Sequence, residues 1–309
     1  MRELILRSLN FKLLLLLSLP LAIGCATSSN HRVKNYELNP ISERLTRTPS
    51  PSQCPTSDRS WRRERLSQIV NHANNCALLG RWDRVEVFGN HLAQSDPWAP
   101  WGAYYLSLSA QGRGELVRAL WMADLALKKS PQTALFHYQK ARVHWSLKEY
   151  DAAIDNLRAS LSHDSNLTEA HLFLGQVYYR DREYRRATQH FNQVLESESN
   201  NALAMVGLAE IRLAQGNSSE AIEFYQRVIS LQPRNMDYRF RLAYIYEVIQ
   251  NDLESALAAY RRIDSFVREN RIPAANFPVN LREKIEFLES SVNLSSASGK
   301  RPQANERGA

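Results

Sequence analysis

The sequence is poor in glycine and proline, the two residues that most often interrupt helices. Only 11 glycines and 12 prolines occur among 309 residues, which suits helices joined by short turns. Hydrophobic residues make up 44% and charged residues 23% of the chain, a balance typical of a globular protein rather than a disordered one. The mean hydropathy is negative, which argues against a protein with many membrane spans.

The sequence also lacks the motifs of common catalytic sites. It contains no His-Glu-x-x-His, no glycine-rich phosphate loop and no Gly-x-Ser-x-Gly. Stacked helices could bring His137 and His171 near each other, but two histidines without a third ligand make a poor metal site, so we expect them to be structural. We therefore expect no enzyme activity, no cofactor and no metal.

The first 24 residues have the pattern of a bacterial export signal. Arg2, Arg7 and Lys12 precede an apolar run over 13–23, which ends at Gly24-Cys25. The run is about half of the roughly 20 residues that a membrane-spanning helix needs. The net charge of +7 falls to +5 without this segment, which removes three basic residues and one acidic residue. Nucleic acid is not an expected partner behind an export signal.

Leu21-Ala22-Ile23-Gly24-Cys25 resembles the lipobox of bacterial lipoproteins. The resemblance implies lipidation of Cys25 and, because Ala26 rather than Asp follows, an outer-membrane anchor. We expect the protein to face the periplasm, and exposure on the outside stays open. The usual leucine three places before the cysteine is replaced by Ala22, so cleavage to a free periplasmic protein stays an alternative. Residues 25–58 are rich in Ser, Thr and Pro and are expected to form a flexible tether.

Only three cysteines occur, and two remain if Cys25 carries lipid. In an oxidising compartment, Cys54 and Cys76 are a disulfide candidate that would close a loop of about 23 residues onto the first helix. The alternative is that Cys76 is a buried thiol and Cys54 is unpaired.

From residue 66 the sequence repeats with a period of about 34 residues. One series of small residues consists of Ala73, Ser107, Ala141, Gly175, Ala209 and Ala243. A second consists of Val85, Ala119, Ala153, Ala187, Ala221 and, after one inserted residue, Ala256. Apolar residues fall at helical spacing in two blocks per unit, separated by a polar turn. Since no unit can cover its own apolar face, neighbouring units must stack.

These positions resemble the tetratricopeptide repeat. The best matching unit contains Leu174-Gly175-Gln176-Val177-Tyr178, Tyr184, Ala187, Phe191, Val194 and Leu195. The resemblance implies an all-α, right-handed superhelical solenoid over 59–292, with about six helical hairpins at 66–99, 100–133, 134–167, 168–201, 202–235 and 236–270. An amphipathic segment at 278–291 is expected to cap the last unit, and residues 293–309 are expected to be disordered.

In this family the first helix of each unit lines a concave groove that binds protein partners. The implied groove residues are Trp101, Tyr104, Tyr138, Arg142, Trp145, Gln176, Tyr179 and Arg180. Aromatic residues beside arginine are common in binding hot spots, although some of these rings can instead pack between units. The places of the family's carboxylate clamp hold Val70, Asn74, Tyr105, Leu135 and Gln139, of which only Asn74 fits.

The expected role is a scaffold or adaptor for envelope proteins, as in tetratricopeptide lipoproteins that serve pilus, secretion or outer-membrane assembly. The alternative is a binder of peptidoglycan or another envelope glycan through the same groove. The client and the oligomeric state stay open.

Overall fold

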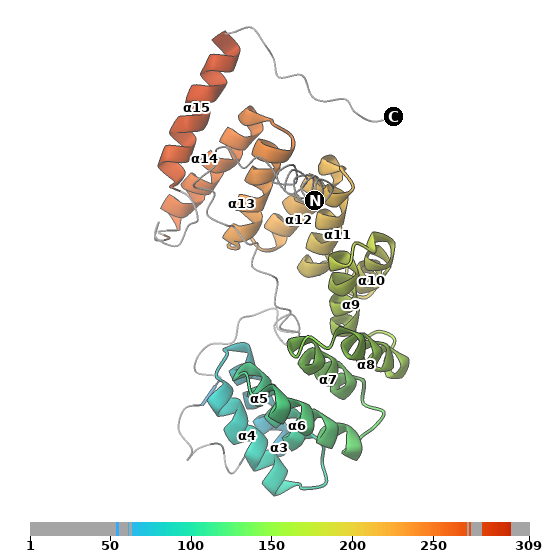
Figure 1. Cartoon of the computed structure of the whole chain (residues 1–309). Helices are drawn as coiled ribbons and strands as arrows, with labels where there is room; N and C mark the ends of the chain where they lie inside the picture. The colour runs from blue at the N-terminus through green and yellow to red at the C-terminus, as the bar shows by residue number, and fades with distance from the viewer. Residues whose placement is uncertain (1–53, 56–60, 62–63, 271, 273–279, 298–309) are drawn as a thin grey trace, which may run out of the picture. The chain divides into compact units, whose positions relative to one another are not determined.

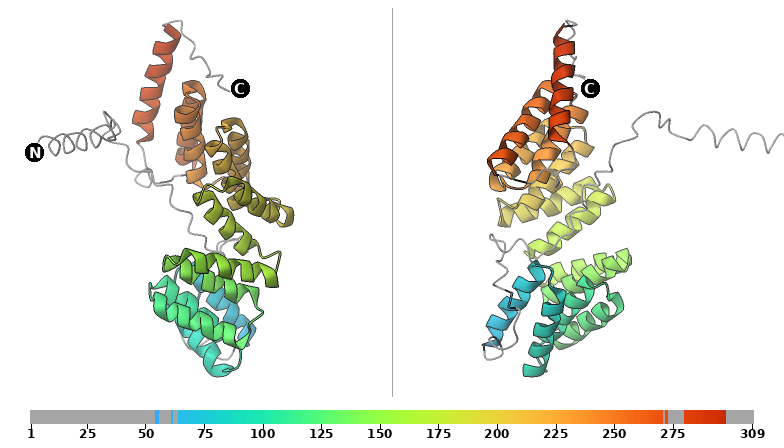
Figure 2. Two further views of the ribbon diagram at one scale, coloured as in Figure 1. Left: turned by 45° about the vertical axis from the view of Figure 1, so that its right-hand side comes forward. Right: turned by 90° about the vertical axis from the view of Figure 1, so that its left-hand side faces the viewer.

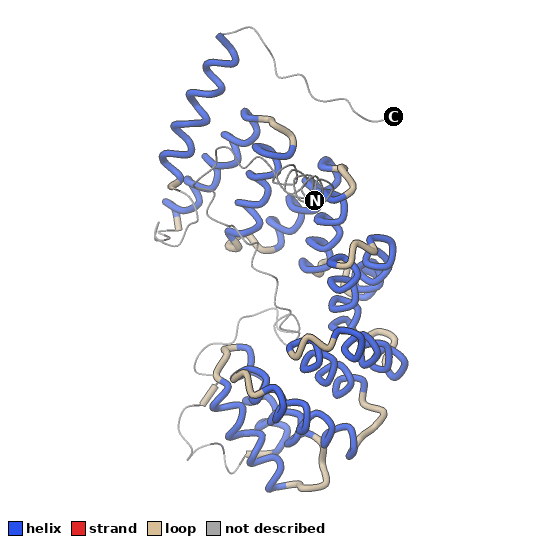
Figure 3. The backbone as a smooth tube through the Cα atoms, viewed as in Figure 1, coloured by secondary structure: helices blue, strands red, loops and turns tan. Residues whose placement is uncertain are grey.

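The computed structural model describes residues 54–55, 61, 64–270, 272 and 280–297, and its helices all belong to one compact unit. This described part contains helices and loops and no strand (Figures 1 and 3). The helices are α3 (Leu66–Leu78), α4 (Trp82–Ser95), α5 (Trp101–Gly112), α6 (Leu116–Lys129), α7 (Ala134–Ser146), α8 (Tyr150–His163), α9 (Thr168–Arg180), α10 (Tyr184–Ser197), α11 (Ala202–Ala214), α12 (Ser218–Leu231), α13 (Met236–Tyr244), α14 (Leu253–Glu269) and α15 (Leu281–Ala297). The observed fold is the expected all-α solenoid of helical hairpins.

Each repeat unit forms one hairpin, and consecutive hairpins stack in chain order (Figure 2). The two small-residue series explain the close packing, since every member of both is buried. Ser107 keeps its hydroxyl satisfied there, because Oγ donates a hydrogen bond to the carbonyl of Ala119 at 2.8 Å. At a related contact, the ring of Phe191 lies against Gly175 and Gly207, where an added Cβ would come within 2.7 and 2.4 Å of it.

The turn inside each hairpin contains one residue in the left-handed region. These residues are Gly80, Gly114, Lys148, Arg182, Gly216 and Asn251, with φ between 54° and 82°. They follow the period of the repeat, apart from the one-residue insertion in the last unit. Glycine adopts this conformation without steric cost, whereas Lys148 and Arg182 hold it with a Cβ in place.

The inserted residue of the last unit is absorbed by a π-helical segment, Ile245–Ile249, between α13 and the turn. A π-turn accommodates one extra residue without ending the helix. Downstream, Asp252 restarts the chain as the N-cap of α14, because its side chain accepts a hydrogen bond from the Ser255 N–H.

The disulfide candidate is formed: Cys54 and Cys76 are joined. Both are buried beside Trp61, whose ring meets Phe88 edge to face at 4.7 Å. The chain before helix α3 is therefore fastened to the first hairpin. The predicted lipidation site Cys25, the signal segment and the tether up to residue 53 lie outside the described residues.

Helix α15 packs on α14 and covers the last hairpin, with Leu288 fully buried. Lys284 of α15 donates to Glu247, which also accepts from the Tyr260 hydroxyl. The helix begins at residue 281 and continues to Ala297, whereas the sequence predicts disorder from 293. The expectation of disorder is therefore wrong for residues 293–297, which continue helix α15. Residues 298–309 lie outside the described part.

A candidate partner-binding face on the first helices

The structure divides the predicted groove residues into surface and core. Tyr104 and Tyr138 are only 4% and 1% exposed, so they cannot form a contact surface. Tyr104 packs against Tyr105 and Phe136, and Tyr138 against Phe173 of the next unit. Their assignment to the groove is corrected: both rings fill the space between stacked hairpins. The other six residues keep at least part of their side chains accessible.

Trp145 and Arg180 are brought together at the step between the third and fourth hairpins. The Arg180 guanidinium lies 4.4 Å from the centre of the Trp145 ring and 4.5 Å from that of Tyr150. Trp145 also meets Tyr150 and Phe173 edge to face, at 4.8 and 5.2 Å. Asp181 accepts a bond from Arg180 Nε at 3.1 Å. We call Trp145, Tyr150, Phe173, Arg180 and Asp181 the arginine cage.

The cage also explains how α7 and α9 are joined. The backbones of α3 and α5, of α5 and α7, and of α9 and α11 come into close contact, whereas those of α7 and α9 approach less closely. The large side chains of the cage fill the wider space between the backbones of α7 and α9. The outer part of the cage stays accessible, because Tyr150 and the Arg180 side chain are 40% and 44% exposed.

Tyr179 continues this face onto the next step. Its ring lies 6.0 Å from that of Tyr184, and burial, followed by the charge of Glu210, raises its pKa above the usual range. Glu210 of α11 binds Arg241 of α13 through two hydrogen bonds of 2.8 and 2.6 Å. Burial alone would lower the pKa of Arg241, but the hydrogen bond and charge of Glu210 raise it. This pair is therefore neutralised internally and links two first helices.

A polar ladder joins α5 to α7 on the same side. Gln111 Nε2 donates to the Arg142 carbonyl at 3.1 Å and to Ser146 Oγ at 3.0 Å. Arg142 in turn donates to Gln139 Oε1 at 3.2 Å. Trp101 lies at the edge of this region, with its ring 5.4 Å from that of Phe136. Gln176 is half-buried on α9.

Sequence reasoning missed Tyr150 as a member of the site. Tyr150 and Tyr184 each begin the second helix of a unit and lie one repeat apart, so the repeat contained the signal. The family resemblance pointed to the first helices alone. The places of a carboxylate clamp are used internally, since Tyr105 and Gln139 are buried and the Tyr105 hydroxyl donates to Asn74 at 2.8 Å.

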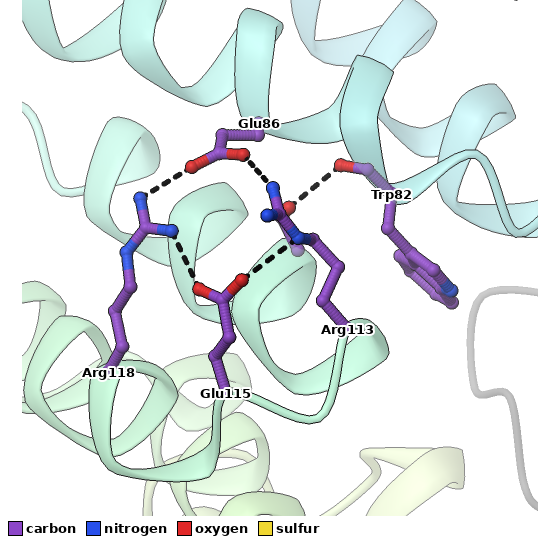
Figure 4. Close-up of polar contacts among 6 residues, drawn as sticks. Trp82, Glu86, Arg113, Glu115 and Arg118 are labelled. Carbon is purple, nitrogen blue, oxygen red and sulfur yellow. Dashed lines mark hydrogen bonds and ion pairs between the residues drawn. The ribbon is translucent and has the colours of Figure 1, made fainter.

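The most extensive charged cluster of the described residues is structural. Glu86 on α4 accepts bonds from Arg113 and Arg118, and Glu115 in the next turn accepts from the same two arginines (Figure 4). The hydrogen bond from Arg118 lowers the pKa of Glu115 and raises that of Arg118. The cluster bridges consecutive hairpins and satisfies its own charges.

The two predicted structural histidines do not meet each other. His171 contacts His190, with the two Nδ1 atoms 2.9 Å apart, and His137 stacks on His163 at 5.1 Å. Within the described residues, no group of three or more His, Cys, Asp or Glu side chains is placed to hold a metal ion. The same part of the chain holds no helix with the length and apolar character needed to cross a bilayer.

Comparison with known families identifies the repeat. Models of the tetratricopeptide repeat match residues 134–166, 172–235 and 225–270. These segments are tetratricopeptide repeats. A tetratricopeptide repeat protein from Parabacteroides merdae superposes with a TM-score of 0.51 at 20% identity, covering 77% of this chain and 94% of that one. The crystal structure of the APC/C hetero-tetramer Cut9–Hcn1 superposes with a TM-score of 0.57 at 13% identity, covering 79% of this chain and 48% of that one. At these identities the likeness shows the tetratricopeptide fold alone.

Two curated relatives match part of this chain. Small glutamine-rich tetratricopeptide repeat-containing protein 2 of Saccharomyces cerevisiae is 31% identical over 144 residues, which are 45% of this chain and 41% of that protein. Lipopolysaccharide assembly protein B of Escherichia coli is 22% identical over 190 residues, which are 60% of this chain and 49% of that protein. The chain thus spans half or less of the length of these relatives.

Proposed function

We propose that this protein is a membrane-anchored scaffold that binds a partner protein on the first-helix face of its tetratricopeptide repeats. The binding face consists of Trp101, Arg142, Trp145, Gln176, Tyr179 and Arg180, together with Tyr150. Mediation of protein–protein contacts is the role expected of the tetratricopeptide fold, which is generally non-enzymatic. We further propose that partners bind this face, that lipid on Cys25 anchors the protein, and that the protein acts in the cell envelope.

The arginine cage is the observation that carries the proposed site. Two aromatic rings hold the Arg180 guanidinium in one orientation, so Arg180 loses little further side-chain freedom when a partner binds it. Arginine and tryptophan in such settings supply much of the binding energy of protein interfaces. Arg142 lies on α7 of the same face, so an acidic or carbonyl-rich segment of the partner is the best match in charge.

The envelope role rests on the signal pattern before Cys25 and on the relatives. The Cys54–Cys76 bond suits an oxidising compartment. Similarity to Lipopolysaccharide assembly protein B, which covers 49% of that protein at 22% identity, is consistent with a role for this protein in envelope assembly.

The test is affinity isolation of the intact protein after crosslinking in its own cells. Arg180→Gln removes the positive charge of the cage while leaving a polar side chain, and we expect it to reduce the recovered partner at least tenfold. Arg282→Gln on α15 is the matched control, since Arg282 is exposed and paired with Glu286 away from this face. Equal recovery with both variants, at unchanged helix content by circular dichroism, would contradict the proposed face.

Glycan binding is the competing outcome, because exposed rings such as Trp101 can stack on sugars. Sedimentation with purified peptidoglycan tests it. Retention that survives high salt and is lost in Trp101→Ala, with no protein partner recovered, would replace the scaffold proposal by the glycan one.

A further inference from the structure

A basic cleft of about 340 Å³ lies between α13 and α14, apart from the proposed binding face. It is lined by Arg239, Arg261, Arg262, Ser265, Phe266 and Glu269. Three of these six side chains carry guanidinium groups, and the other three carry a hydroxyl, an aromatic ring and the Glu269 carboxylate. Such a set of donors around a small concave space is typical of an oxyanion site.

Arg239 is the residue that makes the cleft unusual. Its guanidinium lies over the Phe266 ring, 4.3 Å from the ring centre, and its Nε donates to the Pro233 carbonyl at 3.1 Å. Among the described residues Arg239 makes no ion pair with a carboxylate. It is half-buried, and burial lowers its pKa. A desolvated cation with only neutral partners gains from an added anion.

The other two arginines differ from each other. Arg261 is bound to Glu289 of α15 at 2.7 Å, which fixes one wall of the cleft to the capping helix. Arg262 is exposed and makes no hydrogen bond or ion pair within the described part of the chain. Arg239 and Arg262 therefore supply the charge that is available to a ligand, and Ser265 supplies a hydroxyl beside them.

We infer that this cleft binds a phosphoryl group, as found on a lipid headgroup, a sugar phosphate or free phosphate. A phosphate monoester carries a charge of about −1.5 to −2 at neutral pH and three acceptor oxygens. Two guanidinium groups and a hydroxyl match that charge and number of acceptors better than they match a carboxylate. Glu269 also lines the cleft, where it disfavours a second phosphoryl group and can accept a hydrogen bond from a sugar or glycerol hydroxyl.

The experiment is a titration of the full-length protein with inorganic phosphate, followed by the arginine Nε–H signals in NMR and by calorimetry. We expect saturable binding with Kd below about 1 mM at low salt. Arg239→Gln and Arg262→Gln should each weaken it at least tenfold. Arg227→Gln is the matched control, because Arg227 on α12 also donates to a carbonyl but lies outside the cleft. Affinity for a phosphate monoester should rise as the pH passes about 6, where its dianion forms.

Glycerol 3-phosphate and glucose 1-phosphate then distinguish the sources. Tighter binding of the first points to a lipid headgroup, and of the second to a phosphorylated glycan; equal binding of both and of free phosphate defines a site for phosphate alone. Succinate is the carboxylate probe and should bind at least tenfold more weakly. Succinate binding as strong as phosphate, or equal phosphate affinity of Arg239→Gln and Arg227→Gln, would overturn the inference.

Discussion

At the scale of single residues, the repeat imposes one backbone conformation that not every residue favours. The left-handed turn position is glycine in three hairpins but Lys148, Arg182 and Asn251 in the others. For a residue with a Cβ this conformation costs roughly 1 kcal/mol, and asparagine tolerates it best. Stacking of the hairpins therefore holds the third and fourth turns in place against a local preference.

Replacing Lys148 or Arg182 by glycine should raise the free energy of unfolding by about 0.5–1 kcal/mol, since relief at the turn exceeds the extra freedom gained by the unfolded chain. Urea denaturation followed by circular dichroism measures this. Asn251→Gly is the matched control and should gain less. Destabilisation by both Lys148→Gly and Arg182→Gly would contradict the argument.

The His171–His190 pair gives the protein a pH-dependent element. His171 Nε2 donates to the Ser165 carbonyl at 2.9 Å, so a neutral His171 offers Nδ1 as acceptor to the Nδ1–H of His190. Burial, helped by the adjacent His171, lowers the pKa of His190 to about 4. Two cations lie close by, because Arg186 and Arg158 both contact Tyr178, which stacks on His190.

Because the pKa of His190 is lower in the folded state than the unfolded value of about 6.5, the unfolded state binds more protons below that pH. Stability should be level above pH 6.5 and fall by about 1–2 kcal/mol as the pH drops from 6.5 to 4, after allowance for the partial exposure of the ring. His190→Gln should flatten this slope in urea titrations at several pH values. An unchanged slope in that variant would assign the effect to other groups.

At the scale of elements, the first and last hairpins are stabilised in different ways, the first by the disulfide and the last by helix α15. The disulfide closes the loop between Cys54 and Cys76, which are 22 residues apart, and fastens the preceding chain to α3. A closed loop of this length lowers the entropy of the unfolded chain by an amount worth roughly 3 kcal/mol.

Reduction should therefore lower the free energy of unfolding by about 2–4 kcal/mol and open the first hairpin before the others. Hydrogen exchange resolved by segment measures this, with loss of protection expected in α3. The double variant Cys54→Ser, Cys76→Ser should not respond to a reductant, which separates the disulfide from other effects of the reagent. Unchanged protection of α3 after reduction would show that the bond does not hold the first hairpin.

Helix α15 covers the other end through Leu288 and the Lys284–Glu247 contact. Leu288→Ala removes a fully buried side chain and should cost about 2–4 kcal/mol. Exchange protection should fall first in α13 and α14. Phe287→Ala is the control, because Phe287 is 61% exposed on the same helix, and equal losses in the two variants would argue against α15 as a cap.

At the scale of the whole molecule, the period of the repeat predicted the helices well. Small residues can recur at that spacing only where two helices approach closely, so both series marked buried contacts correctly. The insertion before Ala256 was visible in the sequence, but its absorption by a π-helical segment was not, since that depends on how α13 packs.

The candidate site was less predictable. Sequence position distinguishes the two helices of a hairpin, but it does not say whether a ring reaches solvent or the next hairpin. Tyr104 and Tyr138 therefore looked like surface residues and are core. Tyr150 was missed because the family resemblance pointed to the first helices alone, whereas Tyr150 begins a second helix and contacts Arg180 of the following unit.

The central claim is that the first-helix face, rather than the outer face of the second helices, meets the partner. The most direct test places a photo-crosslinking benzoylphenylalanine at Gln176 or at Glu223, an exposed position on α12, in the full-length protein inside living cells. The account predicts a discrete protein adduct from position 176 that disappears with Arg180→Gln, and none from position 223. An adduct from position 223 alone would contradict it.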